Sequence, residues 1–225
     1  MKKINTIKDF LEIVDSFGKY GQIYRGLGKA SYKLIPSLSR YKKKSIERKF
    51  DLLKKEKDSI RIFETEYQQY HPMRVNNNWE LLSLAQHHGL PTRLMDWSLS
   101  PLVALFFAVE KFHNEDAAIY ILDNNNIWLY GNNLKKHNPF NISSPMIYMP
   151  NQISQRQKAQ QGVFTIQPDL DKEFDVKGLN KIIIDKKSVN IIKWNLFTYG
   201  ISTKSVYPDI DGLCSQLKWS HFESF

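Results

Sequence analysis

The chain places two histidines, an arginine, an aspartate and a tryptophan within eleven positions, in the stretch QHHGLPTRLMDWS at 86–98. An apolar run, LVALFFA, follows at 102–108. Polar side chains packed this densely against a core-forming segment are typical of a ligand pocket or of a buried hydrogen-bond network. Both interpretations stay open here, and the candidate pocket residues are His87, Thr92, Arg93, Asp96 and Trp97.

The residues after Gly89 indicate how this stretch would bind a ligand. Gly89 ends a helix and Pro91 forces an extended step, so we expect segment 92–97 near the N-terminus of the next helix. Free N–H groups at a helix N-terminus bind anions, and Arg93 would add a bidentate contact. In the alternative interpretation Arg93 pairs with Asp96, three residues away, because structural ion pairs outnumber functional ones.

The adjacent His87 and His88 can equally be a helix cap and a core side chain. No third Cys, His or carboxylate stands at ligand spacing near them, so we expect no metal site. The chain also contains no GxSxG, HExxH or CxxC pattern.

A second candidate is Arg25, which stands between Tyr24 and Gly26 directly after a short strand. Its planar guanidinium suits a phosphate or the ribose of a nucleotide, and Gly26 would let the ligand approach the backbone. The spacing matches neither a Walker loop nor a Rossmann fingerprint.

A third candidate is RQKAQQGVFT at 156–165. A helical turn would put Arg156 and Gln160 on one face, since they are four residues apart, and Gly162 would release the chain into a strand. The alternative is a plain helix-to-strand junction in which Gln160 caps backbone groups.

Composition favours a folded protein with one domain. The chain has 225 residues, of which 42% are hydrophobic, and its single cysteine, Cys214, excludes an internal disulfide. With no signal peptide and no apolar run near the ~20 residues of a membrane span, we expect a cytoplasmic protein without a membrane segment. The net charge of +9 favours polyanionic partners, or is the solvated face of the Lys-rich helices.

The hydrophobic patterns predict an α+β fold, with N-terminal helices followed by a mixed, mainly antiparallel sheet. The expected helices lie at 5–16, 45–71, 79–88, 100–113 and 186–199. The expected strands are QIYRG, AAIYILD, NIWLY, GVFTIQP, KIIID and GISTKSVYP.

The motifs together resemble the FRG domain family, named for an aromatic-Arg-Gly motif. The blocks that carry the resemblance are YRG, LIPSLSR, LAQHHGLPTRLMDWSLSPLVALFFA, RQKAQQGVFT and VYPDIDGL, in the order of the family. The resemblance implies a single FRG domain over 1–225, with 1–20 as a helical lead-in. Many members have tyrosine where this chain has His88, so we assign His88 no role that requires a histidine.

The block order is also similar to that of ADP-ribosyltransferases, which implies an ADP-ribosyltransferase-like fold and NAD as substrate. These enzymes carry an Arg on an early strand, then a Ser/Thr-containing strand followed by a helix, and finally a Glu or Gln at a later strand. By this resemblance Arg25 holds the nicotinamide ribose or pyrophosphate, Tyr24 or Trp97 is the platform for nicotinamide, and Gln160 or Gln161 takes the late position. Because Gln cannot act as a general base, His87 or Asp96 does that work, or the acceptor needs no strong base, or there is no catalysis.

Three hypotheses follow. The first is an NAD-dependent ADP-ribosyltransferase or NAD glycohydrolase of a bacterial toxin or phage-defence type, with a nucleic acid or a protein as acceptor. The second is a non-catalytic module that binds a nucleotide or nucleic acid. The third is a structural domain in which 86–97 is a buried network. The sequence leaves the oligomeric state open.

Overall fold

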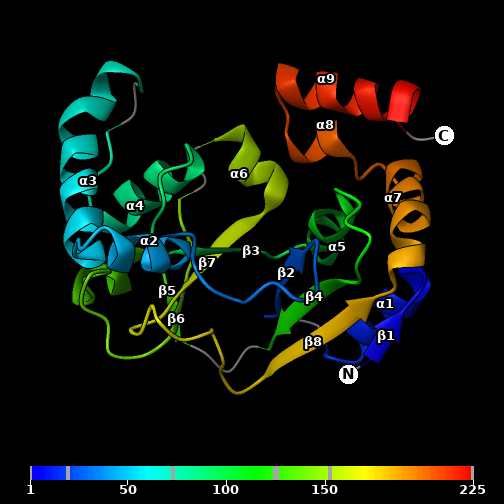
Figure 1. Ribbon diagram of the computed structural model, residues 1–225, viewed down its shortest axis with the longest axis horizontal. Helices are drawn as coiled ribbons and strands as arrows, with labels where there is room; N and C mark the ends of the chain where they lie inside the picture. The colour runs from blue at the N-terminus through cyan, green and yellow to red at the C-terminus, as the bar shows by residue number, and fades with distance from the viewer. Residues whose placement is uncertain (1, 19–20, 72–73, 124–126, 152–153, 224–225) are drawn as a thin grey trace.

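The computed structural model describes residues 2–18, 21–71, 74–123, 127–151 and 154–223 (Figure 1). Within these ranges eight strands form one mixed sheet in the order β1-β8-β4-β2-β3-β7-β6-β5. The strands are β1 (Lys2–Ile4), β2 (Ile23–Leu27), β3 (Met95–Ser98), β4 (Ala117–Leu122), β5 (Ile127–Leu129), β6 (Met146–Tyr148), β7 (Gly162–Ile166) and β8 (Leu179–Ile184).

Neighbouring strands are antiparallel except for the parallel pairs β1–β8 and β5–β6. The α+β class and the mixed, mainly antiparallel sheet are therefore confirmed. Helices and strands are interleaved along the chain rather than separated, because β1, β2 and β3 come from its first half.

The helices are α1 (Ile7–Asp15), α2 (Lys42–Glu47), α3 (Leu52–Glu66), α4 (Asn78–His87), α5 (Pro101–Val109), α6 (Gln155–Gln160), α7 (Val189–Thr198), α8 (Thr203–Val206) and α9 (Ile210–Lys218). Short 3-10 turns are η1 (Leu38–Tyr41), η2 (Tyr67–Gln69), η3 (Gly131–Lys136) and η4 (Lys186–Ser188), and the π-helical turn η5 (Trp219–Glu223) follows α9. In the described part of the chain, every helix is too short or too polar to cross a bilayer.

Helix α5 is the centre of the core. It begins as its sequence predicts, because the hydroxyl of Ser100 accepts a hydrogen bond from the Val103 N–H and Pro101 occupies the first turn. Its residues pack against β2 and β4 on one side and against α1 and α7 on the other. This arrangement gives the neighbouring strand β2 a rigid support.

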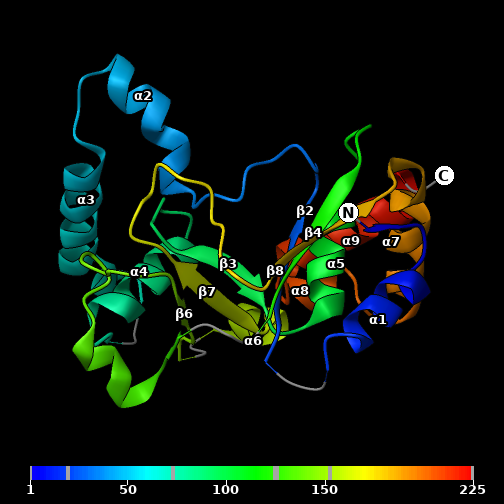
Figure 2. The ribbon, with the colours of Figure 1, turned by 90° about the horizontal axis from the view of Figure 1, so that it is seen from below.

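The two ends of the sheet carry different helices (Figures 1 and 2). At one end, α3 and α4 pack on β6 and β7 through Ile60, Trp79 and Tyr148. At the other end α1 and α7 cover β1 and β8. The middle strands β2, β3 and β7 lie between these two ends, with α6 and α8 nearby (Figure 1).

The single helix expected over 45–71 is wrong. It is divided between α2 and α3, because Lys49 adopts a left-handed conformation with φ 54° and Asp51 starts a new helix as its N-cap. The break leaves Ile46 and Leu53 exposed by 67% and 48%, so the helical spacing of apolar residues across it does not mark one buried face.

The strand expected at 200–208 is also wrong, since this segment forms the short helix α8. Ser202 caps it, with the hydroxyl of Ser205 accepting a hydrogen bond from the Ser202 N–H. Conversely, segment 95–98 is the central strand β3, which the sequence did not predict, and α5 begins soon after it at Pro101. Its pairing with β7 outweighs the weak strand propensity of Asp and Ser.

Candidate functional site

Strands β2 and β3 diverge, and a cavity opens where they do. Their register consists of the single pair Tyr24↔Ser98, whereas β3 pairs with β7 over its whole length from Met95 to Ser98. The guanidinium of Arg25 fills the gap, with Nη1 donating a hydrogen bond to the carbonyl oxygen of Asp96. A side chain on β2 thus satisfies a backbone group of β3 that regular pairing would otherwise serve.

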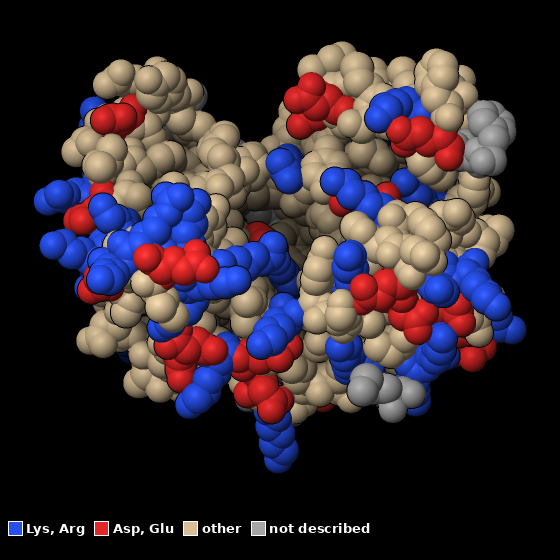
Figure 3. All heavy atoms as spheres, viewed as in Figure 1, with Lys and Arg blue, Asp and Glu red and all other residues tan. Residues whose placement is uncertain are grey.

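The cavity, called the central cavity below, has a volume of about 340 Å3. Figure 3 shows the face hollowed at its centre, between the end with α3 and α4 and the end with α8 and α9. Eight of the eleven residues expected at a site line it, which are Tyr24, Arg25, Gly26, His87, Asp96, Trp97, Arg156 and Gln160. Sequence reasoning missed other lining residues, among them Gln86, Ser98 and Phe107.

Asp96 is the one carboxylate among the described residues that line the cavity. Its side chain is 66% exposed, and Oδ2 lies 3.8 Å from Nη1 of Arg25. Oδ1 accepts a hydrogen bond of 2.7 Å from Nε2 of Gln86. The other end of that amide, Oε1, accepts the hydroxyl hydrogen of Thr92, which itself accepts the N–H of Leu94 at 3.1 Å. The carboxylate is therefore oriented by a chain of hydrogen bonds.

Arg25 is a buried cation with unused donor capacity. Its side chain is 14% exposed, and burial lowers its pKa, opposed by the charge of Asp96. Nε is buried and has no hydrogen-bond partner among the described residues. An unsatisfied buried donor costs about 1–3 kcal/mol, so the fold holds Arg25 in this place at a cost to stability.

His87 is neutral at physiological pH. Burial, together with the nearby His88, Arg156 and His71, lowers its pKa to about 4, against the opposite effect of Asp96. The rings of His87 and His88 meet edge to face at 4.9 Å between centroids. A neutral imidazole can donate or accept one hydrogen bond, but with this pKa it is a weak base.

Arg156 brings a second guanidinium to the cavity from α6. Its Cζ lies 4.7 Å from the centre of the Tyr207 ring, and that ring meets Phe107 at 6.3 Å between centroids. Burial raises the pKa of Tyr207, so its hydroxyl stays neutral. The half-buried Phe107 is the more accessible aromatic wall, since Trp97 and Tyr24 are 3% and 5% exposed.

Comparison with known proteins assigns part of this site to a family. Residues 21–117 match the FRG domain family. The chain carries an FRG domain. The matched region includes Arg25, Asp96 and the whole 84–108 block, while the blocks around Gln160 and Tyr207 lie beyond it. No curated protein and no solved structure matches the chain, so the ADP-ribosyltransferase-like fold stays a prediction.

Beyond the matched region, Gln160 and Gln161 differ in position. The side chain of Gln160 lines the cavity, and its Nε2 donates to the carbonyl of Val206 at 3.3 Å. Gln161 is exposed, with φ 47° at the end of α6, and does not line the cavity. Ser98 joins the two sides of the site, because its hydroxyl donates to the carbonyl of Gln160 at 2.7 Å.

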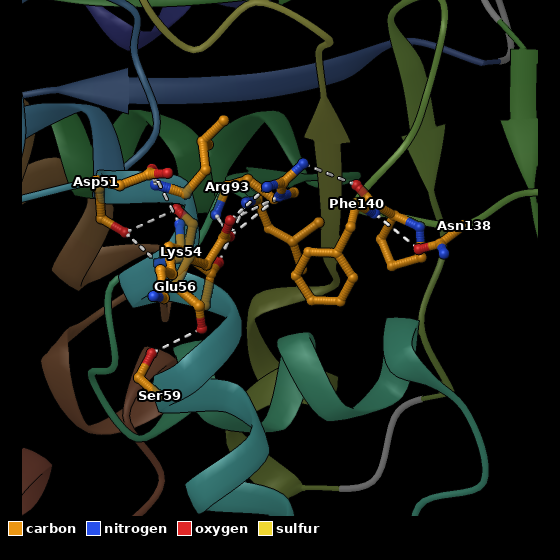
Figure 4. Close-up of polar contacts among 12 residues, drawn as sticks. Asp51, Lys54, Glu56, Ser59, Arg93, Asn138 and Phe140 are labelled. Atoms are coloured by element: carbon orange, nitrogen blue, oxygen red, sulfur yellow. Dashed lines mark hydrogen bonds and ion pairs between the residues drawn. The ribbon is translucent and has the colours of Figure 1, made fainter.

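Arg93 does not line the cavity and has a structural role in the FRG domain. Its Nε and Nη2 donate to the carboxylate of Glu56 on α3 at 2.9 and 2.5 Å, and Nη1 donates to the carbonyl of Pro139 (Figure 4). Glu56 is 1% exposed and Arg93 5%. The expected alternative partner, Asp96, pairs with Arg25 instead, because the guanidinium of Arg93 is already occupied by Glu56.

Thr92 and Gly26 also differ from their expected roles. Thr92 is fully buried and acts through Gln86 rather than on a ligand. Gly26 lines the cavity, but its missing side chain makes room for α5: an added Cβ would lie 2.0 Å from the carbonyl oxygen of Ala104. Close packing of α5 on β2 therefore requires this glycine.

Proposed function

We propose that this FRG-domain protein cleaves NAD and transfers ADP-ribose to water or to another acceptor. One observation carries the proposal: Arg25, Ser98 and Gln160, from three separate blocks, lie on or beside the adjacent strands β2, β3 and β7 around one cavity. Their order matches the Arg, Ser/Thr and Glu/Gln positions of ADP-ribosyltransferases. Their common cavity supports the proposal.

The two arginines are suited to bind the pyrophosphate and ribose. Arg25 and Arg156 both line the cavity, and their guanidinium groups are suited to donate to phosphate or ribose oxygens. A cavity of about 340 Å3 is at the small end of ligand sites, so we place the nicotinamide riboside half of NAD inside it. Phe107 supplies an aromatic wall for the nicotinamide ring.

Asp96 is the proposed electrostatic catalyst. In hydrolysis, the bond from the ribose C1′ to the pyridinium nitrogen breaks and its electron pair leaves with neutral nicotinamide. Water forms the new bond to C1′ and loses its proton to solvent. The positive charge that develops on the ribose is stabilised by a fixed carboxylate, and Gln86 keeps Asp96 oriented for that purpose.

The reaction needs little base strength. Departure of nicotinamide creates the electrophile, so Gln160 is compatible with cleavage, as a donor to the ribose rather than as a base. The low pKa of His87 agrees with a role in hydrogen bonding and not in proton abstraction.

The test is a proton NMR time course of the purified protein with NAD. We expect the wild type to release nicotinamide and Asp96→Asn to release it at least about a hundredfold more slowly, as for loss of one electrostatic group in an active site. Asp58→Asn, a matched change of an exposed carboxylate on α3, should release it at the wild-type rate. The proposal is overturned if the wild type releases no nicotinamide, or if Asp96→Asn equals it.

A second candidate function is a nucleotide-binding module without catalysis. It is favoured by the amide of Gln160, which is held by Val206 at the position where a transferase has its late polar residue. In the same NMR experiment, this function predicts broadened NAD resonances that are sharpened by Arg25→Ala, with no nicotinamide released.

For the biological role, we propose a cytoplasmic toxin or phage-defence effector that depletes NAD in a bacterial cell. Expression of the wild type in a bacterial host should lower cellular NAD and stop growth, and expression of Asp96→Asn at the same level should not. Normal growth and NAD content with the wild type would contradict this role.

A further inference from the structure

A dense positive surface lies beside the central cavity. It consists of η1, α2 and the residues that follow α2, and is called the basic strip below. Its exposed cations are Arg40, Lys42, Lys43, Lys44, Arg48 and Lys49. Figure 3 shows blue side chains gathered over the part of the molecule that carries α2 and extending toward the central hollow.

Few carboxylates neutralise the basic strip. Lys42 pairs with Asp171 at 2.8 Å and Lys43 with Glu47 at 3.9 Å, and both pairs are exposed to solvent. Exposed pairs of this kind contribute about 0–1 kcal/mol, so a phosphate can replace the carboxylate as the partner of each lysine at little cost. The strip is therefore more than the balanced charge of a solvated helix.

The basic strip is joined to the wall of the cavity. The Leu38 N–H and the Ser37 hydroxyl donate to the carbonyl of Thr92 at 3.2 and 3.3 Å. Thr92 in turn holds Gln86, the residue that orients Asp96. A ligand bound along the strip would thus lie at the edge of the site.

Charge and an exposed aromatic ring indicate the same neighbourhood and the same kind of ligand. Arg40 is near enough to Arg25 that its positive charge helps lower the pKa of Arg25. Tyr41, 41% exposed, stands between Arg40 and Lys42. Cations that contact phosphates, interspersed with rings on which bases stack, are typical of single-strand binding surfaces.

We propose that the basic strip binds single-stranded nucleic acid and directs it to the central cavity as the acceptor of ADP-ribose. The acceptor role rests on the proposed function, whereas binding does not. An unpaired base is required, because a base within a duplex cannot enter a recessed cavity. An anionic membrane is the less suitable partner, since a flat bilayer surface would not reach Asp96.

In the transfer step the acceptor takes the place of water. A nitrogen of the base that carries a hydrogen forms the bond to C1′ as the bond to nicotinamide breaks, and the electron pair of that bond leaves with neutral nicotinamide. The proton lost by the base nitrogen passes to Asp96 and then to solvent. No oxidant or further co-reactant is needed.

Binding is tested by fluorescence anisotropy with labelled single-stranded DNA and RNA oligonucleotides of mixed sequence. The test variant is Lys43→Gln/Lys44→Gln/Arg48→Gln. The matched control is Lys2→Gln/Lys8→Gln/Lys187→Gln, which removes the same charge from exposed residues at the end that carries β1 and α1 (Figure 1). All six side chains are exposed, so neither variant should disturb folding.

We expect the test variant to bind at least about tenfold more weakly and the control less than about twofold. The slope of log affinity against log salt should fall by about 2 in the test variant, since each lost phosphate contact accounts for about 0.7. Tyr41→Ala should weaken binding by at least about fivefold through lost stacking, with the salt slope unchanged.

The proposal is overturned if the wild type binds no oligonucleotide at low salt, or if the control variant loses as much affinity. It is also overturned if phosphatidylserine vesicles bind in a strip-dependent manner and oligonucleotides do not. Nicotinamide release separates this proposal from the proposed function. Nicotinamide release without oligonucleotide binding would support NAD cleavage and contradict nucleic-acid binding by the basic strip. Oligonucleotide binding without nicotinamide release would support the basic strip as a binding surface and contradict NAD cleavage.

Discussion

The carboxylate of Asp96 and the guanidinium of Arg25 face each other at 3.8 Å across the point where β2 and β3 diverge. The same guanidinium also donates a hydrogen bond from Nη1 to the backbone carbonyl of Asp96, in a place where β2 and β3 have no regular strand pairing. One pair of residues thus closes a gap in the sheet and supplies the carboxylate of the site and one of its two guanidinium groups. The remaining residues of the site can be judged by how they support this pair.

Gln86 is expected to be a positioning residue for Asp96. In Gln86→Leu the carboxylate loses its 2.7 Å hydrogen bond, and we expect nicotinamide release to slow by about ten- to a hundredfold. The effect should appear in kcat more than in KM, since Gln86 orients a group that acts on developing charge. Gln68→Leu, an exposed position on η2, is the control, and an unchanged kcat in Gln86→Leu would contradict this role.

The Arg93–Glu56 pair is expected to affect stability and not the reaction. Arg93→Met leaves Glu56 buried without its partner, which should cost about 3–5 kcal/mol of unfolding free energy in urea denaturation. The double variant Glu56→Leu/Arg93→Met should regain most of that loss. Nicotinamide release per folded molecule should match the wild type, and a selective loss of activity would show that Arg93 belongs to the site.

Helix starts could be predicted from the sequence, whereas the partner of Arg93 could not. The helices expected at 5–16 and 100–113 begin at the N-caps Thr6 and Ser100 of α1 and α5, and such starts are predictable because capping depends on residues within one turn. The partner of Arg93 is Glu56, 37 positions away, and local spacing favoured Asp96 instead. Interactions that are set by tertiary structure leave little trace in a single sequence.

The same limit applies to the strands and to the cavity. Strands β4 and β8 were predicted from runs of apolar and β-branched residues. Strand β3, with the sequence MDWS, was not, since its pairing with β7 and not its composition makes it a strand. Gln86 and Ser98 could have been predicted from the sequence, as both lie in the 84–108 block beside His87 and Trp97.

Gly26→Ala is expected to destabilise the protein by more than a typical small-to-large change. The new Cβ would lie 2.0 Å from Ala104 O and 2.5 Å from Ala108 N, both backbone atoms of α5, so the helix must move. Overpacking of this kind costs about 1–3 kcal/mol or more in urea denaturation. The matched control is Gly162→Ala, where the nearest atom is an ordinary 3.9 Å away. Equal stability of the two variants would show that α5 does not pack closely on β2.

His87 should make the protein less stable as pH falls below neutrality. Its pKa is about 4 in the folded state, below the ordinary value of 6.5, so between these values the unfolded chain binds more protons than the folded one. Stability contributed by the neutral ring is therefore complete above pH 6.5 and decreases as pH falls toward 4.

The measurement is the urea midpoint from pH 7.5 to 4.5 for the wild type and for His87→Gln. The two curves should converge at low pH, because the variant lacks the proton uptake of His87 and loses less stability over this range. His88→Gln is the neighbouring control, with a smaller effect of the same sign, since burial also lowers the pKa of His88. Parallel curves for the wild type and His87→Gln would show that His87 titrates normally and is open to solvent in the folded protein.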